Sequence, residues 1–516
     1  MTPYFNLVDE PWIPCLMPDN RLQEFGLLEV LVRAPEIREI FHSSPLVVTA
    51  VHRLLLAILH RNFGPESLAA WKELWERRSF DAQALQEYFD RWRERFFLFH
   101  PERPFYQVPR MEDARVHPVQ LLALEAAAGN NATLFDHHFS EHPATFRPAQ
   151  AACYLVARQA YSIGLGKSHP FYFSDSPLIR GYTVLVLGKN LFQTLALNLL
   201  PVHQDRPIPR IDEDLPSWEL PSLPEPDPRG NLITGYISYL TWQSRRIHLI
   251  AEGNSPVVRF CQIQQNWKLP EPTPLDPFKS YRRLEKEGLV PRGLSPERAV
   301  WRDCHALLEL QGRPEVLASL AQKKAILRDR KDCQFSITGA ATEGGKAAQL
   351  ILWRYERLPL PLDYLEDENL LGELRNALEV CERAHDCLNQ HMRNLAALVL
   401  APPVGGQKRQ ADPQEVARLV QSWAPGRRYW ARLEAPFRHL MAELPADQVE
   451  NEEGEVVYGT RLLPEWRRTV YKAARQSFQE VAKSLENSLR SLKALAQVEG
   501  RFFAALKKEL LPEEQT

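Results

Sequence analysis

The stretch DENLLGELRNALEVCERAHDCLNQHMRNLAALVL, residues 367–400, divides the chain into two kinds of sequence. Its apolar residues recur at intervals of three and four, which is the spacing of one face of an α-helix. Acidic residues gather at its start, where they suit the N-terminal end of a helix. The stretch predicts a long amphipathic helix with an apolar stripe formed by Leu371, Leu374, Leu378, Cys381, Leu388, Met392, Leu395 and Val399.

The residues after this stretch continue to show helical patterns. PQEVARLVQSWA, RRYWARLEAPFRHLMAEL and the tail that begins PEWRRTVYKAARQ all carry apolar residues at helical spacing. Several amphipathic helices joined by loops favour an antiparallel bundle. We therefore predict two domains, residues 1–365 and residues 366–516, with a helical bundle in the second.

The first 365 residues mix helical and strand patterns, so the expected fold class is α+β. Asp81 is the expected N-cap of one helix. The segment 201–231 is rich in proline and acid, which predicts an extended connector. Helices are predicted within 45–99, 119–128, 149–162, 190–200 and 295–327, and strands at 182–188, 237–252, 255–264, 333–338 and 349–360.

Composition limits the classes of function. The chain has 516 residues, 44% hydrophobic and 25% charged, with a formal net charge of −2. These are globular values without a global basic field, so any contact with nucleic acid must come from local patches. The seven cysteines form no C-x-x-C pair, which fits a reducing cytosol and argues against a zinc ribbon. No signal peptide or uninterrupted apolar span is visible, so we expect a soluble cytoplasmic protein with no membrane partner.

Two glycine–lysine stretches resemble parts of a phosphate-binding loop, which needs G-x-x-x-x-G-K-[ST] between a strand and a helix. In YSIGLGKS, residues 161–168, Tyr161 stands where the first glycine belongs. In AATEGGKA, residues 340–347, alanine stands at the first-glycine and hydroxyl positions, and Glu343 would repel phosphate. Neither stretch predicts a nucleotide site. Two interpretations stay open: a turn that happens to hold a lysine, or a backbone turn that approaches a DNA groove.

The other candidate sites are a histidine stretch and several basic clusters. In LFDHHFSEH, residues 134–142, adjacent histidines on a loop point apart, so we predict no metal site and no cofactor. Each basic cluster alone is typical of a solvated face, but several near the glycine stretches favour contact with a phosphate backbone. Their residues are Arg245, Arg246, Lys279, Arg282, Arg283, Arg328, Arg330, Lys331, Arg467, Arg468, Lys472 and Arg475.

Two motifs and the order of parts together resemble a known family. The motifs are FNLVDEPWIPC at 5–15 and FHPERPFYQVP at 99–109. Between and after them come a helical block, an asparagine-rich loop, a glycine loop, the stretch WQSRRIHL, a second glycine loop and C-terminal helices. On these features the chain resembles the large subunit of the type I-E CRISPR surveillance complex Cascade, the CasA family. The resemblance implies a mixed α/β N-terminal domain of unusual topology followed by a four-helix bundle.

The resemblance also implies a function without catalysis. The family reads the short protospacer-adjacent motif (PAM) in double-stranded target DNA and helps to open the duplex. The guide RNA then pairs with one strand in an R-loop, and a helicase–nuclease is recruited. Base pairing reads the target in this scheme, whereas the protein reads the PAM. The implied partners are the target duplex, the crRNA 5′ handle, the other Cascade subunits and the recruited helicase–nuclease.

The same resemblance assigns DNA contacts to the two glycine stretches. The first matches the family's glycine loop, in which backbone approaches the PAM beside a lysine. The second, TEGGKAAQ, lies where the family has a wedge that pushes between base pairs. A lysine falls at or near the wedge's glutamine position, and it can hold a phosphate but cannot mimic a base amide. The implied contacts are Gly164, Gly166, Lys167, Gly344, Gly345 and Lys346.

Two further assignments follow from the resemblance. The family's lysine finger lies after WQSRRIHL, where it matches either Arg259 or Lys268. The loop NNATLFDHHF matches a loop that contacts the guide's 5′ handle and a neighbouring subunit. The residues implied in that contact are Asn130, Asn131, Phe135, Asp136 and His137.

Two other functions stay open from the residues alone. A nucleotide-dependent enzyme built on the glycine–lysine stretches would bind ATP with magnesium, and changing Lys167 would abolish its turnover. If the chain is a purely structural scaffold subunit, substituting Gly166 or Lys346 would leave DNA affinity unchanged.

Overall fold

The computed structural model describes residues 2–126, 144–163, 174–201, 208, 210–211, 213–251, 257–327, 333–342, 350–402 and 410–511. The chain forms two compact units. The first comprises Met1–Val300 and Glu309–Leu358, and the second comprises Trp301–Leu308 and Pro359–Thr516. The sequence prediction placed the division between residues 365 and 366. In the structure the division comes earlier, and a short segment from the middle of the chain belongs to the second unit.

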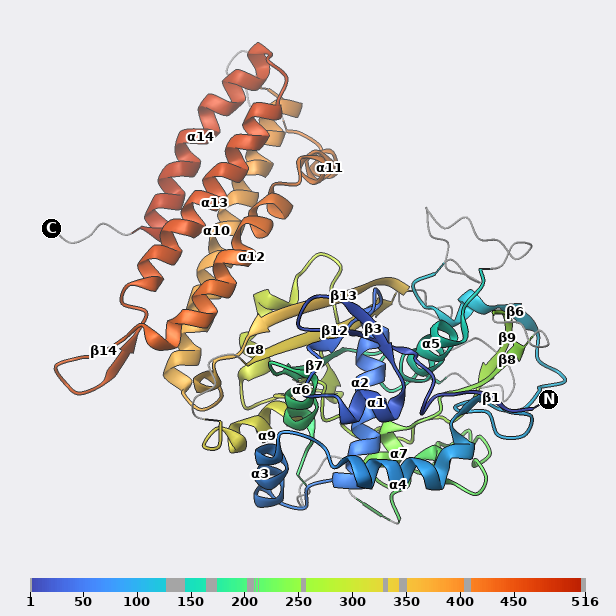
Figure 1. The fold of residues 1–516 in the computed structure, drawn as a ribbon. Helices are drawn as coiled ribbons and strands as arrows, with labels where there is room; N and C mark the ends of the chain where they lie inside the picture. Colours follow the sequence, from blue (N-terminus) through green and yellow to red (C-terminus); the bar gives the residue numbers. More distant parts are fainter. Residues whose placement is uncertain are drawn as a thin grey trace. The chain divides into compact units, whose positions relative to one another are not determined.

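The first unit combines helices with several small antiparallel sheets (Figure 1). Its helices are α1 (Leu27–Val32), α2 (Pro45–Phe63), α3 (Leu68–Arg77), α4 (Ala82–Trp92), α5 (Pro148–Ala160), α6 (Leu191–Asn198), α7 (Tyr236–Leu240) and α9 (Glu315–Lys323). Its strands are β1 (Tyr4–Asn6), β2 (Ile13–Leu16), β3 (Leu22–Phe25), β4 (Glu39–Ile40), β5 (Phe97–Phe99), β6 (Val116–Pro118), β7 (Tyr182–Leu187), β8 (Arg245–Ala251), β9 (Val258–Gln265), β10 (Tyr281–Leu284), β11 (Gly288–Pro291), β12 (Gln334–Thr342) and β13 (Leu350–Pro359).

Helix α2 forms the centre of the first unit. Most of its side chains are buried, and it contacts α5, α6, α7 and β12. By length and mean hydropathy it could cross a membrane, but its burial is that of a core helix inside a folded domain.

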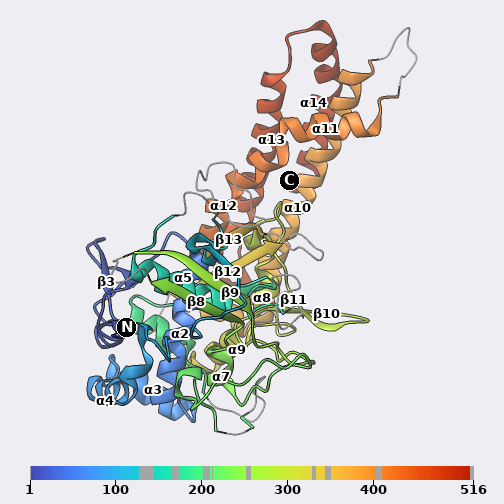
Figure 2. The ribbon, with the colours of Figure 1, turned by 90° about the vertical axis from the view of Figure 1, so that its right-hand side faces the viewer.

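Two antiparallel sheets of the first unit carry the segments that matter for function. In one, β9 pairs with β8 and with β6, for example through Ile247 opposite Ile263. Figure 2 shows β8 and β9 beside α5, which β8 contacts. In the other, β12 lies between β7 and β13 and pairs with β7 through Phe335 opposite Val186. The predicted strands at 182–188, 255–264, 333–338 and 349–360 are therefore confirmed within the residues that the structure describes, which exclude 255, 256 and 349.

The predicted strand at 237–252 is wrong in its first half. Residues 236–240 form helix α7, and only residues from Arg245 onward form β8. The carboxylate of Asp214 accepts hydrogen bonds from the backbone N–H groups of Ile237 and Ser238, both at 2.8 Å. A Cβ atom at Gly235 would lie 2.4 Å from the Asp214 carboxyl carbon, so only glycine allows this approach. A cap supplied by a distant residue therefore starts the helix, and local periodicity does not reveal it.

Other local predictions have mixed outcomes. Asp81 is the N-cap of α4, where its carboxylate accepts a hydrogen bond from Ala84 N at 3.0 Å, as predicted. The helix predicted at 119–128 is a short 3₁₀ turn over Val119–Leu122. The region 295–327 holds separate short helices, and the β10–β11 hairpin was not predicted. Its turn depends on Gly288, whose φ of +71° favours glycine.

Lys323, at the end of α9, is fully buried against α3 and α6. Its Nζ donates to the carbonyl oxygens of Leu197 at 3.0 Å and Leu199 at 2.9 Å. It also lies 4.7 Å from the centroid of the Trp71 ring. Burial lowers the pKa of Lys323 to about 7. The chain therefore keeps a lysine at the C-terminal end of α6, where a cation suits the helix dipole.

The stability of the first unit should depend on pH through Lys323. Its pKa in the folded chain, about 7, lies below its ordinary value, so the unfolded chain binds more protons between the two values. Stability should therefore rise with pH in that window. Between roughly pH 7.5 and 9.5, the free energy of unfolding should rise by about 2 kcal/mol more for the wild type than for Lys323→Met. Urea unfolding at a series of pH values measures this, and a difference that stays constant with pH would contradict it.

The second unit is mainly helical. Its helices are α8 (His305–Leu308), α10 (Glu368–Leu400), α11 (Pro413–Trp423), α12 (Pro425–Glu443), α13 (Leu462–Ser484) and α14 (Leu489–Leu510). A hairpin of β14 (Gln448–Glu450) and β15 (Val456–Tyr458) joins α12 to α13. The long helices α10, α12, α13 and α14 pack against one another (Figure 1).

Helix α10 organises this packing. Asp367 is its N-cap and accepts from Leu370 N at 2.9 Å, and the predicted apolar stripe is buried except for the half-buried Val399. Two donors from other helices bond to carbonyl oxygens on α10. Tyr429 Oη donates to Cys381 O at 2.8 Å, and Trp466 Nε1 donates to Ala377 O at 2.9 Å.

The segment Trp301–Leu308 is an integral part of the second unit. The Trp301 ring lies 4.8 Å from the Phe437 ring, centroid to centroid. The Arg302 guanidinium forms an ion pair with Glu382 on α10 at 2.8 Å and lies 3.6 Å from the Trp430 ring centroid. These contacts explain why this segment groups with helices that follow it by more than fifty residues.

Candidate nucleic-acid interface

Arg245 bonds to both residues that flank the segment 164–173. Its Nη2 donates to the carbonyl oxygens of Ile163 at 2.9 Å and Ser174 at 2.8 Å, which flank that segment. Only 1% of the Arg245 side chain and backbone is exposed, so these bonds form away from water. Buried guanidinium donors satisfied by carbonyls hold a geometry firmly, because breaking them leaves buried polar groups unpaired.

A polar network beneath Arg245 joins α5 to β8. The Gln159 amide accepts from Arg245 N at 2.9 Å and donates to Arg245 O at 2.9 Å. The Ser244 hydroxyl donates to Gln159 O at 2.7 Å and lies 2.6 Å from the Ser176 hydroxyl. All four side chains are buried. A buried network of hydrogen bonds therefore supports the residues that flank the 164–173 segment, which we call its base.

Arg180 connects this base to the second glycine stretch. Its Nε donates to Asp175 Oδ2 at 2.7 Å, and its Nη1 donates to Thr342 Oγ1 at 3.1 Å. Thr342 ends β12, directly before residues 343–349. Asp175, which follows the segment 164–173, and Thr342, which precedes residues 343–349, therefore bond to the same arginine, although the two glycine–lysine stretches are far apart in sequence.

Lys268 lies at the same base. The Ser174 hydroxyl donates to Trp267 O at 3.3 Å, which places the neighbouring Lys268 beside the end of the 164–173 segment. Lys268 Nζ donates to Pro228 O at 3.1 Å and lies 3.7 Å from the Glu271 carboxylate. About a quarter of its side chain, 26%, is exposed.

Arg259, the alternative match for the same role, lies elsewhere. It is exposed on β9 next to Val258, which exchanges backbone hydrogen bonds with Phe146 at 2.7 and 2.9 Å. Phe146 follows the segment 127–143, so Arg259 lies close to the residues that directly follow that segment. The rise of a strand separates Arg259 from Gln265 by roughly 20 Å. Of the two candidates, Lys268 is the one at the base of the glycine stretches.

Several predicted residues lie outside the described part of the chain. Their predicted roles stay predictions, although the residues that flank them are described. They are the glycine-stretch residues Gly164, Gly166, Lys167, Gly344, Gly345 and Lys346, the loop residues Asn130, Asn131, Phe135, Asp136 and His137, and the basic-cluster residues Arg328, Arg330 and Lys331.

Two members of the basic clusters are buried, which corrects the expectation that they face phosphate. Arg245 bonds to backbone carbonyls as described above. Lys279 is 5% exposed, and its Nζ donates to Pro177 O at 2.6 Å. Burial lowers the pKa of Lys279 to about 8, and the charge of Asp276 opposes this shift. Both residues support the fold beneath the site instead of contacting a partner.

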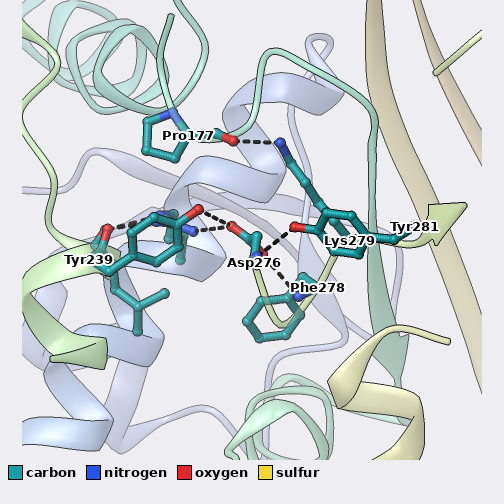
Figure 3. A network of polar contacts seen from close by, with 8 residues as sticks. Pro177, Tyr239, Asp276, Phe278, Lys279 and Tyr281 are labelled. Carbon is teal, nitrogen blue, oxygen red and sulfur yellow. Dashed lines mark hydrogen bonds and ion pairs between the residues drawn. The ribbon is translucent and has the colours of Figure 1, made fainter. Parts of the chain in front are cut away.

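The contact between Lys279 and Pro177 belongs to a buried network centred on Asp276 (Figure 3). Asp276 Oδ2 accepts from Arg53 Nη1 at 3.2 Å and from Tyr239 Oη at 2.9 Å, and Oδ1 accepts from Phe278 N at 2.9 Å. Burial and the carboxylate raise the pKa of Tyr239 well above its ordinary value. The network fixes the turn 276–279, and through Lys279 it fixes the segment that follows residue 173.

The described residues include no group of three or more histidine, cysteine, aspartate or glutamate side chains that could hold a metal ion. The cysteines are free thiols, and all except Cys387 are buried. Burial raises the pKa of Cys261 to about 12. The chemistry of the described site is therefore that of arginine and lysine donors on rigid backbone.

Comparisons with known proteins agree with this architecture. The family model described as CRISPR-associated protein Cse1 matches residues 6–477. The CRISPR-associated protein CasA/Cse1 of Thermus thermophilus is 34% identical over 521 residues, covering 96% of each chain. A crystal structure of Thermus thermophilus CasA matches with a TM-score of 0.79 and 30% identity, over 98% of this chain and 100% of that one.

A chain of a CRISPR RNA-guided surveillance complex has the same fold, with a TM-score of 0.75 and 22% identity over 97% of this chain and 100% of that one. The α+β first unit and the helical second unit predicted from the sequence are confirmed by these likenesses and by the elements above.

Proposed function

The chain belongs to the CRISPR-associated protein Cse1 family, and from that premise we propose that it is the large subunit of a type I-E Cascade complex that recognises the PAM in target DNA. In this proposal the chain also helps to open the duplex so that the guide RNA can pair. It assembles with the other Cascade subunits and the crRNA 5′ handle, and it helps to recruit the helicase–nuclease. The proposal assigns the chain no catalytic step.

The observation that carries this proposal is the shared base of the two glycine–lysine stretches. Arg245 donates to Ile163 and Ser174, which flank 164–173. Arg180 bonds to Asp175 and to Thr342, the residue directly before 343–349. If both glycine–lysine stretches contact one short length of duplex, they must start from positions that are fixed relative to each other. Lys268 lies at the same base, so in this proposal it is the lysine finger, whereas Arg259 adjoins the segment assigned to the guide's 5′ handle.

Physical chemistry supports a protein that recognises the PAM through backbone and lysine contacts. The minor groove presents nearly the same acceptors for A·T and T·A, so backbone and lysine contacts there tolerate several PAM sequences. Separating a base step costs a few kcal/mol, which an inserted turn can offset. R-loop formation is otherwise close to balanced, so a small local contribution decides whether it starts.

Two substitutions test the proposal in the assembled complex. Gly166→Asp places a carboxylate near phosphate, and Lys346→Ala removes a cation. Each should weaken binding of a PAM-bearing duplex about tenfold and leave assembly unchanged, and Lys346→Ala should reduce the salt slope by about 0.9. Electrophoretic mobility shifts at fixed salt measure the affinity, and size-exclusion chromatography measures assembly.

The matched control is Lys72→Ala, which removes an exposed lysine from α3. It should leave the affinity unchanged. Equal binding by the wild type, Gly166→Asp and Lys346→Ala would contradict the proposal and favour a purely structural subunit.

A further inference from the structure

A recessed groove of about 570 Å³ opens on the first unit, between residues 102–110 and the proline-rich residues 217–226. Buried residues line it, among them Phe105, Trp218 and Asn266. Its volume is that of a concave site for a drug-sized ligand, about 300–1,000 Å³. A short piece of a flexible chain fits such a space, whereas a double helix does not.

Arginines dominate the charge of this groove. Arg95, Arg103, Arg110 and Arg246 line it, against the carboxylates of Glu102 and Glu225. Within the described residues, none of these four guanidinium groups forms an ion pair with a carboxylate. Arg95 donates to Leu220 O at 3.3 Å, and burial together with the nearby charge of Arg103 lowers its pKa. Four arginines against two carboxylates leave an excess of positive charge in the groove, and holding like charges together costs free energy that an anionic ligand would offset.

The groove begins at the base of the glycine stretches. Successive side chains of a strand point to opposite faces, so Arg246 faces away from the buried side that Arg245 occupies. Asn266 lines the groove and directly precedes Trp267, whose carbonyl accepts from Ser174. One wall of the groove therefore lies close to Ser174, the residue that directly follows the segment 164–173.

We propose that the groove binds the sugar–phosphate backbone of single-stranded nucleic acid, with the arginines contacting phosphates. Arginine presents a planar fork of donors that matches phosphate oxygens. The recessed shape selects a single strand. This assignment stands on the groove alone, and only the source of the strand, a target duplex that has been opened, rests on the proposed function.

The experiment compares two double variants of the full chain. Arg103→Gln with Arg110→Gln removes two exposed charges from the groove, and Arg77→Gln with Arg91→Gln removes two exposed charges from α3 and α4. Binding of a fluorescent oligo-dT is measured by anisotropy at several salt concentrations. The groove variant should bind at least about tenfold more weakly, with a salt slope smaller by roughly 1.4, and the control variant should match the wild type.

A second ligand and a duplex assay make the outcomes distinct. Equal oligo-dT affinity for the wild type and the groove variant overturns the proposal. Loss of oligo-glutamate binding with unchanged oligo-dT binding also overturns it, because the groove would then belong to an acidic protein segment. Arginine-dependent oligo-dT binding upholds the groove even if Gly166→Asp leaves duplex binding by the assembled complex unchanged, a result that counts against the proposed function alone.

Discussion

Replacing Arg245 by methionine is expected to lower the free energy of unfolding of the first unit by about 3 kcal/mol and to weaken binding of a PAM-bearing duplex at least tenfold. The loss of stability follows because the carbonyls of Ile163 and Ser174 lose their buried donor, at about 1–3 kcal/mol each. The loss of affinity follows because the ends of 164–173 are no longer fixed, so binding must order them first.

Urea unfolding of the chain and mobility shifts of the assembled complex measure the two effects. Arg229→Met is the control for stability, since that side chain is 90% exposed, and it should leave unfolding nearly unchanged. Arg245→Lys should give intermediate values, because an ammonium can still donate to the carbonyls that Nη2 reaches but has no second nitrogen to replace Nη1, which donates to Ser244 O at 2.6 Å. A loss of stability with unchanged duplex affinity would mean that Arg245 supports only the fold.

Replacing Asp276 by asparagine is expected to cost about 4 kcal/mol of unfolding free energy. The reason is that the Arg53 guanidinium, 7% exposed, would keep its charge in the core without the carboxylate 3.2 Å away. The amide would also be unable to accept all the bonds that Tyr239 and Phe278 now donate to the two carboxylate oxygens.

Thermal and urea unfolding measure this effect. The matched control, Asp19→Asn, breaks an exposed pair with Arg21 and should leave the transition nearly unchanged. A loss smaller than about 1 kcal/mol for Asp276→Asn would show that the core relaxes to hydrate Arg53.

Local patterns were sufficient for some elements and insufficient for others. The stripe from Leu371 to Leu395, the acidic start of α10 and the cap Asp81 were predictable because their signals lie within one helix. Helix α7 was not, because its cap, Asp214, lies more than twenty residues upstream. The periodicity of apolar residues along the sequence does not reveal such a tertiary contact.

The charged residues of the site show a second limit of prediction from sequence. Arg245 and Lys279 look like members of basic surface clusters, yet both are buried and donate to backbone carbonyls. Every residue has a backbone carbonyl, so no acidic residue in the sequence reveals where Arg245 and Lys279 form their hydrogen bonds. The base shared by the two glycine–lysine stretches was likewise invisible, since Arg180 and Thr342 are far apart in the chain.

The placement of Trp301–Leu308 in the second unit has a consequence for biosynthesis. The ribosome completes this segment well before it makes Phe437 and Trp430, against which Trp301 and Arg302 pack. At about 5–20 residues per second, the wait is on the order of ten seconds. During that interval Trp301 and Arg302 lack these partners, so the core of the second unit can be completed only after Trp430 and Phe437 have been made.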